Sequence, residues 1–259
     1  MSRIIAVANQ KGGVGKTTTS VNLAASLVVM RRTVLIIDMD PQGNATTGVG
    51  LDKEDSPIAL TDVLLGDANI KDAIQEVPSA NMDALAGGPN LSVAEFKMMN
   101  MDEREYRLHH ALAEIKNNYD FIIIDCPPSL NMLTVNALVA ANGVLIPMQC
   151  EYYALEGLSA LVGSIETIRQ NSNPALEITG LLRTMYDPRN NLSRDVSNQL
   201  SEYFGDKLYN TSIPRNIRLA EAPSHGLPAL LYDKRSRGAL AYLALAAEMI
   251  RKEASREAA

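Results

Sequence analysis

The segment RIIAVANQKGGVGKTTTS, residues 3–20, constrains the fold more than any other part of the chain. Ile4–Ala8 is a short apolar run typical of a buried strand, and helix-spaced apolar residues follow over 14–28. The loop between them is rich in glycine, which permits a tight turn whose backbone amides converge on an anion. The helix that follows directs the positive end of its dipole at the same point. This order of strand, glycine loop and helix predicts a phosphate-binding loop in an α/β protein.

Two side chains of this loop suit a bound nucleotide. Lys16 supplies a positive charge for the β- and γ-phosphates, and the Thr17 hydroxyl is placed to ligate Mg²⁺. The loop also departs from the usual pattern. Gln10 stands where the ordinary motif has glycine, and a second lysine, Lys11, comes directly after it.

Carboxylates follow two further apolar runs. TVLII, residues 33–37, leads into Asp38 and Asp40, and FIII, residues 121–124, leads into Asp125. Parallel strands present such residues at the carboxyl edge of a sheet, where open α/β sheets bind their ligands. Asp125 has the form of a Walker B aspartate, which holds Mg²⁺ or a water bound to it.

Strand-like and helix-like segments alternate along all 259 residues, with no Gly/Ser-rich linker. We therefore expect one α/β domain over 1–259, built on a doubly wound, mostly parallel sheet flanked by helices. Residues 43–55 are predicted as loop, with helices over 58–64 and 101–117. The last helix is expected over 238–253.

Net charge, cysteine content and hydropathy limit the partners and the cellular setting that the protein can have. The net charge of −6 argues against nucleic acid, yet residues 180–238 hold nine Lys or Arg against six Asp or Glu. This excess fits either a confined phosphate-binding patch or a balanced solvated surface. Cys126 and Cys150 offer no disulfide framework, which favours a reducing cytosol. No apolar run approaches the roughly 20 residues of a membrane span.

Five motifs together resemble the ParA/Soj chromosome and plasmid partition ATPases, a branch of the MinD/ParA group with a deviant Walker A loop. They are KGGVGKTT, DMDPQGNAT, FIIIDCPPSL, LLRTMYDPRNNLS and IPRNIRLAEAPSHGLP, and they cover nearly the whole chain in the family's order. The resemblance implies a cytoplasmic, nucleoid-associated ATPase that uses ATP and Mg²⁺. It also implies an ATP-bound homodimer that binds DNA without sequence preference and releases it when a ParB-type partner stimulates hydrolysis.

The same resemblance assigns roles to individual residues. Lys11 reaches the nucleotide of the partner subunit, Asp40 positions or activates the attacking water, and both act in catalysis with Lys16. The metal shell is Thr17, Asp38 and Asp125, and the DNA contacts are Arg189 and Arg218. The expected ATP-binding residues are Lys11, Gly12, Gly13, Val14, Gly15, Lys16, Thr17, Thr18, Pro214, Arg215 and Asn216, of which the last three border adenine.

One position departs from the family pattern. Arg183 stands in GLLRTMYD, where an apolar residue is common, and it is expected either to extend the basic surface or to pair with an acid. Arg194, Lys234, Arg235 and Arg237 are further candidates for the basic patch. No helix-turn-helix precedes the first strand, which favours the short Soj-like subgroup.

Three other functions are known among proteins with a phosphate loop of this kind. A MinD-like membrane-cycling ATPase needs a C-terminal amphipathic helix with bulky apolar residues, whereas this chain ends in an Ala/Leu-rich helix expected to pack on the core. No stable membrane association is therefore expected. An iron–sulfur reductase relative needs an exposed cysteine pair, and a small-molecule kinase needs an arginine-rich lid; neither pattern is found in the sequence.

Overall fold

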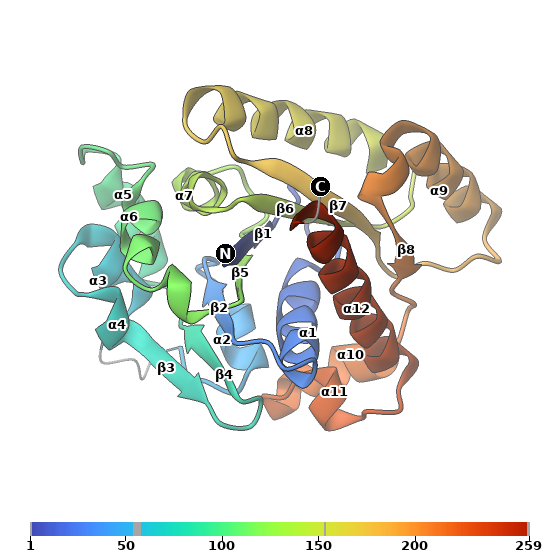
Figure 1. The fold of residues 1–259 in the computed structure, drawn as a ribbon, viewed down its shortest axis with the longest axis horizontal. Helices are drawn as coiled ribbons and strands as arrows, with labels where there is room; N and C mark the ends of the chain where they lie inside the picture. The colour runs from blue at the N-terminus through green and yellow to red at the C-terminus, as the bar shows by residue number, and fades with distance from the viewer. Residues whose placement is uncertain (1, 54–57, 153, 258–259) are drawn as a thin grey trace.

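The computed structural model describes residues 2–53, 58–152 and 154–257. Its centre is a sheet with the strand order β3-β4-β2-β5-β1-β6-β7-β8 (Figure 1). All pairings are parallel except β3 with β4, which confirms the predicted mostly parallel sheet. The strands are β1 (Arg3–Val7), β2 (Val34–Asp38), β3 (Ile74–Val77), β4 (Met82–Leu85), β5 (Phe121–Asp125), β6 (Gly143–Met148), β7 (Glu177–Arg183) and β8 (Leu208–Ser212).

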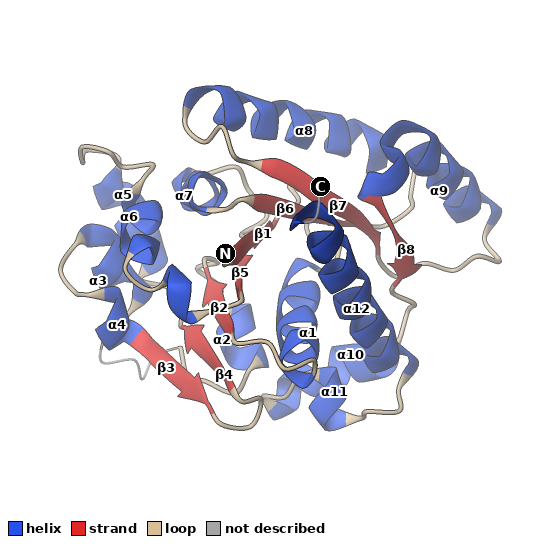
Figure 2. Cartoon of the chain, viewed as in Figure 1, coloured by secondary structure: helices blue, strands red, loops and turns tan. Residues whose placement is uncertain are grey.

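Helices cover both faces of the sheet (Figure 2). One face packs against α3 (Leu60–Leu65), α4 (Ile70–Ala73), α5 (Leu91–Met98), α6 (Arg107–Ala113), α7 (Met132–Ala140), α8 (Ala154–Asn171) and α9 (Asn191–Phe204). The other packs against α1 (Lys16–Val29), α2 (Asn44–Gly48), α10 (Ile217–Glu221), α11 (Ala229–Tyr232) and α12 (Arg237–Glu257). Single 3-10 turns lie at Lys116–Asn118, Gly205–Lys207 and Ala222–His225.

The central strands are apolar because both of their faces are covered. Every residue of β2, β5 and β6 is buried, as parallel sheets between two helical layers require. The polar residues that end or follow β1, β2 and β5 therefore lie at one edge of a buried sheet. This edge holds the predicted phosphate loop.

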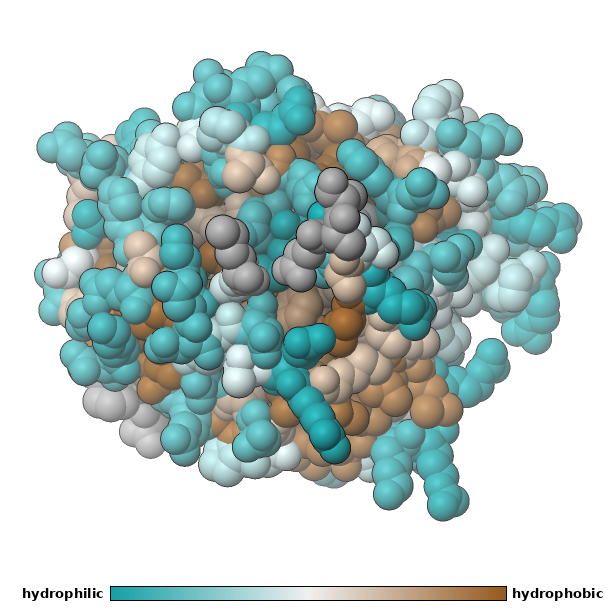
Figure 3. All heavy atoms as spheres, in the orientation of Figure 1, coloured by the Kyte–Doolittle hydropathy of each residue, from teal (hydrophilic) through white to brown (hydrophobic). Residues whose placement is uncertain are grey.

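The C-terminal helix α12 packs on the core, as the sequence predicts. Tyr242, Leu245 and Met249 on its inner side are fully buried, and it lies beside α1 (Figure 1). The face of the molecule viewed in Figure 3 is mostly hydrophilic, with hydrophobic side chains gathered around this helix. Within the described residues, no helix is long and apolar enough to cross a membrane.

Several predicted boundaries were wrong. The predicted loop over 43–55 contains the helix α2, because Gly43 adopts a left-handed conformation and Thr46 is bonded to Asp38; residues 54 and 55 lie outside the described part. The predicted helix over 101–117 is only α6, followed by a 3-10 turn. The prediction also missed β3, α5 and α7.

Candidate nucleotide-binding site

The phosphate loop joins β1 to α1 in the predicted manner. Gly13 and Gly15 have φ angles of 72° and 85°, a left-handed conformation that favours glycine, and Gly15 is the N-cap residue directly before α1. The side chain of Lys16 folds back over the loop, where its Nζ donates to the Lys11 carbonyl at 3.1 Å. Burial lowers the pKa of Lys16, while the nearby Asp125 opposes that shift. The loop thus holds a buried ammonium group close to its own backbone.

Asp125 receives two hydroxyl groups from α1. Thr17 Oγ1 donates to Oδ2 at 2.8 Å, and Ser20 Oγ donates to Oδ1 at 2.7 Å. These bonds fix the first turn of α1 against the end of β5. Because the Thr17 proton points at Asp125, the lone pairs of that oxygen are left for another partner.

Asp38 is held in a comparable way by α2. Its Oδ2 accepts both the amide and the hydroxyl of Thr46 at 2.8 Å, and its Oδ1 accepts the amide of Asp40 at 3.1 Å. The Asp40 carboxylate in turn accepts the amide of Gln42 at 3.0 Å. Asp38, the last residue of β2, is thus bonded to the turn that carries Asp40, and both aspartates are buried.

The two strand-end carboxylates oppose each other electrostatically. Asp38 and Asp125 are direct partners in the β2–β5 ladder. Burial raises the pKa of both, and the charge of Asp38 raises the pKa of Asp125 further. A cation placed between them would relieve this repulsion. Together with the Thr17 hydroxyl they form a set of hard oxygen donors, which suits Mg²⁺.

A cavity lies beside the phosphate loop. It has a volume of about 260 Å³, and Gly15 and Thr18 form one wall. Pro214, Arg215 and Asn216 form another, so the structure places the predicted adenine segment next to the loop. Asn216 also begins α10, since its side chain accepts the amide of Arg218.

Sequence reasoning missed several residues of this region. The Thr184 hydroxyl donates to the Val14 carbonyl at 2.7 Å, and Met185 and Tyr242 line the cavity of the adenine segment. Thr46 and Ser20 orient the two aspartates. In the sequence, each is only a serine or threonine a few residues after a motif residue. Such residues are too frequent to identify a functional side chain.

Lys11 points away from the loop and pairs with Glu151 at 2.5 Å. Both side chains are about half exposed, at 45% and 49%. The neighbouring Gln149 donates to the Gly13 carbonyl at 3.0 Å. The segment after β6 therefore contacts the phosphate loop at both Lys11 and Gly13.

The predicted DNA-contacting arginines lie on the surface, each with a carboxylate. Arg189 forms a two-pronged bond with Asp187, which lowers the pKa of that carboxyl to about 2. Arg218 pairs with Glu221 at 2.7 Å and with Asp233 at 3.4 Å. The structure does not bring either arginine into the phosphate loop.

Arg183 fits neither expectation. Its guanidinium donates to the carbonyls of Tyr209 and Asn210 and to the Ser197 hydroxyl, each at 2.9 Å. No acidic residue in the described ranges forms an ion pair with it, and it lies over the Tyr186 ring. Arg183 instead ties β7 to β8 and α9.

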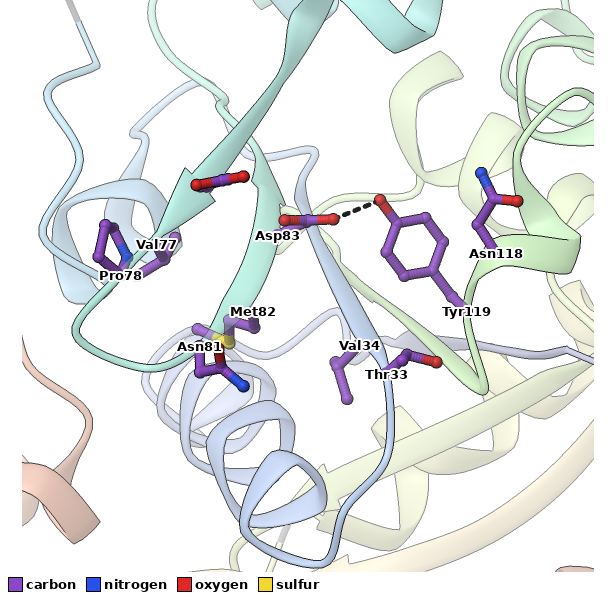
Figure 4. A pocket seen from close by; sticks show the side chains of 10 residues that line it. Thr33, Val34, Val77, Pro78, Asn81, Met82, Asp83, Asn118 and Tyr119 are labelled. Atoms are coloured by element: carbon purple, nitrogen blue, oxygen red, sulfur yellow. Dashed lines mark hydrogen bonds between the residues drawn. The ribbon is translucent and has the colours of Figure 1, made fainter.

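The cysteines are not placed as reactive thiols, and the histidines do not join a metal-binding group within the described residues. Cys126 is completely buried, and burial raises the pKa of its thiol; burial also raises the pKa of Cys150 to about 11. Across residues 2–53, 58–152 and 154–257, no three His, Cys, Asp or Glu side chains form a group suited to a metal ion. A larger cavity of about 410 Å³ contains the bond from Tyr119 to Asp83 (Figure 4). It lies at the starting ends of β2 and β4, remote from the phosphate loop.

Proteins similar in sequence to this chain include ATPases of chromosome partitioning and related proteins. A family model described as an AAA domain matches residues 2–178. The sporulation initiation inhibitor protein Soj of Bacillus subtilis is 52% identical, over 96% of this chain and 98% of its own. The chromosome partitioning protein ParA of Caulobacter vibrioides is 48% identical, over 99% of this chain and 97% of its own.

Solved structures show the same fold. A cobyrinic acid a,c-diamide synthase from Mycobacterium smegmatis, with bound ATP analogue and magnesium, superposes with a TM-score of 0.86 at 37% identity, covering 98% of this chain and 97% of that one. The cell division ATPase MinD of Pyrococcus furiosus gives 0.81 at 28% identity, covering 97% and 99%. The chain therefore belongs to the ParA/Soj family of chromosome-partitioning ATPases, which shares the MinD fold.

Proposed function

We propose that this protein moves DNA by an ATP-driven cycle. In the cytoplasm, binding of ATP and Mg²⁺ promotes a homodimer that holds nucleoid DNA without sequence preference. Hydrolysis, stimulated by a ParB-type partner, releases the DNA. The observation that carries the proposal is the meeting of Lys16, Thr17, Asp38 and Asp125 beside the cavity bordered by Pro214, Arg215 and Asn216.

In this cycle the loop amides from Gly12 to Thr18 and the Lys16 ammonium bind the phosphates. Thr17, Asp38 and Asp125 hold Mg²⁺, which neutralises phosphate charge when bound. Asp40 orients the attacking water from the turn after β2. Catalysis of this kind depends mainly on positioning and on compensation of charge.

Lys11 completes the site from the partner subunit. In the isolated chain it is bonded to Glu151 on the surface, where it is available to a second molecule. Because its charge arrives only with the partner, hydrolysis is coupled to assembly. Its contribution resembles that of an arginine finger.

DNA is held through its phosphates. Arg189 and Arg218 are exposed cations on loops or short helices, and no recognition helix is required for backbone contacts. Arg189 exchanges Asp187, and Arg218 exchanges Glu221 and Asp233, for a phosphate. Binding of this kind is insensitive to sequence and strongly dependent on salt.

The test is binding of the protein to a non-specific DNA duplex with ATP, with ADP and without nucleotide, at two salt concentrations. We expect tight binding with ATP alone, weakened at the higher salt. Equal binding in all three states, or none, would contradict the proposal. Co-sedimentation with liposomes in the presence of ATP would point to a MinD-like cycle instead.

A further inference from the structure

The helix α5 presents an uncovered apolar face. Val93 and Phe96 on the helix and Met99, which directly follows it with helical backbone angles, are 50%, 72% and 55% exposed. Their spacing of three places them on one side. The opposite side of α5 is buried through Leu91, Ala94 and Met98. The helix is thus firmly seated, and the exposed apolar side chains are not explained by its packing.

The segment before α5 is attached to the Asp38 side of the nucleotide site. The amide of Gly87 donates to Thr46 Oγ1 at 2.9 Å, and the Thr46 hydroxyl donates to Asp38. Gly87 also lies so close to the Asp38 backbone that a Cβ would be 2.2 Å from its carbonyl oxygen. Leu91, the first residue of α5, follows only four residues later.

The middle of α5 is attached to the Asp125 side. Glu95 accepts the amide of Met132 and the side-chain amide of Asn131, both at 3.1 Å. Asn131 begins α7, which follows the loop after Asp125. Leu130 in that loop is itself 41% exposed. α5 therefore connects the two segments that carry the metal-facing aspartates.

The surroundings of the apolar face are acidic. The loop after α5 carries Asp102, Glu103 and Glu105, against Arg104, whose guanidinium donates to the Met99 carbonyl. The exposed Lys97 on α5 is the other cation of this segment, so three acids stand against two bases over residues 97–105. A ligand that covers the apolar stripe and complements this rim has apolar side chains flanked by Lys or Arg.

From this arrangement the geometry points to α5 as the docking surface for the partner that stimulates hydrolysis, through a basic, apolar segment of that partner. The inference rests on the proposed function and specifies where its regulation acts. A segment seated on Val93, Phe96 and Met99 shifts α5, and with it the bonds from Glu95 to the start of α7 and the link through Gly87. Because these contacts lead to both aspartates, docking alters the geometry in which the water and phosphate meet.

The experiment uses the full chain and the full-length ParB-type protein of the same cell, with ATP, Mg²⁺ and DNA. Phe96→Ser with Met99→Ser should lower the affinity for that protein at least tenfold and abolish stimulation. Basal ATPase activity and ATP-dependent DNA binding should remain as in the wild type. Tyr203→Ser, which alters an 80% exposed tyrosine on α9, is the matched control and should be stimulated normally.

Two further variants distinguish binding of the partner from its stimulation of ATP hydrolysis. Asp102→Lys with Glu103→Lys should weaken binding and reduce its salt dependence. Glu95→Ala should leave affinity nearly unchanged but reduce maximal stimulation several-fold, because docking is retained and its connection to α7 is lost.

Normal stimulation of the Phe96 and Met99 variant would overturn the inference and leave the proposed function standing. Loss of ATP-dependent dimerisation in that variant, measured by sedimentation, would overturn it in favour of a contact between two copies of the chain. If the wild type itself binds DNA with ATP but is not stimulated, the partner assignment and this inference both fail. If it does not bind DNA either, the proposed function fails as a whole.

Discussion

Asp38 and Asp125 lie directly opposite each other where the parallel strands β2 and β5 end, and both are buried. Thr46 holds the first, and Thr17 and Ser20 hold the second. Two buried carboxylate charges repel each other and destabilise the metal-free protein, and burial raises the pKa of each. The pair is thus suited to bind a cation, and it lowers the folding stability of the protein when no cation is bound.

The repulsion between the two carboxylates predicts that the free energy of unfolding of the metal-free protein depends on pH. A carboxyl whose pKa is raised on folding binds protons more tightly in the native state, so stability falls as pH rises from the ordinary carboxyl range through the raised pKa. Asp125→Asn removes one charge, and the hydroxyls of Thr17 and Ser20 can rotate to fit the amide. We expect the metal-free variant to gain on the order of 1–2 kcal/mol at pH 8 and less at pH 5.5.

Thermal unfolding without Mg²⁺ at the two pH values measures this gain. The exposed Asp195→Asn on α9 serves as the control, with no comparable change expected. An Asp125→Asn protein that is less stable than the wild type at pH 8 would show that the pair is not strained.

Lys16→Ala should abolish nucleotide binding. The ammonium is buried and its charge is directed at the phosphate loop, so its loss removes charge-assisted bonds that amount to about 3 kcal/mol, roughly a hundredfold in affinity. Titration with a fluorescent ATP analogue measures the effect. Affinity within threefold of the wild type would remove Lys16 from the site.

Lys11→Ala should separate binding from turnover. Its ion pair with Glu151 is half exposed, so we expect stability to change by at most about 0.5 kcal/mol. ATP binding by the single chain should persist, while hydrolysis falls on the order of 10³-fold, as after loss of an arginine finger. Normal turnover of the variant, measured as phosphate release, would exclude a role for Lys11 across the dimer.

Arg189→Ala and Arg218→Ala should each weaken ATP-dependent DNA binding by about tenfold, or about 1.4 kcal/mol. Each should also lower the slope of log K against log salt by about one, since one phosphate contact is lost. Arg169→Ala is a suitable control, because Arg169 forms a similar i,i+3 ion pair on α8. Retention on DNA unchanged in both variants would place the contact surface elsewhere.

The sequence was sufficient wherever burial on both faces makes a strand uniformly apolar. This pattern located β1, β2 and β5, and with them the positions of Asp38 and Asp125 at one edge. The Gly-Lys-Thr spelling located the start of α1 for a similar reason, because left-handed backbone at Gly15 requires glycine.

Other features depend on contacts distant in sequence. α2 is only five residues long and is stabilised by the bond from Thr46 to Asp38, so its local sequence pattern resembles a loop. α5 shows no clear apolar periodicity of its own, because Val93 and Phe96 on its exposed side add apolar residues to the buried set of Leu91, Ala94 and Met98. Arg183 binds carbonyls that only the β7–β8 pairing brings within reach.

The most direct measurement is the retention of the Asp40→Ala protein on a non-specific duplex with ATP and Mg²⁺, together with its rate of phosphate release. Asp40 contacts neither Lys16 nor Thr17 through a hydrogen bond, so nucleotide binding should remain. We predict hydrolysis reduced on the order of 10²-fold or more and a long-lived, salt-sensitive complex with DNA that forms with ATP and not with ADP. Wild-type turnover, or DNA binding that is the same with and without ATP, would contradict the account.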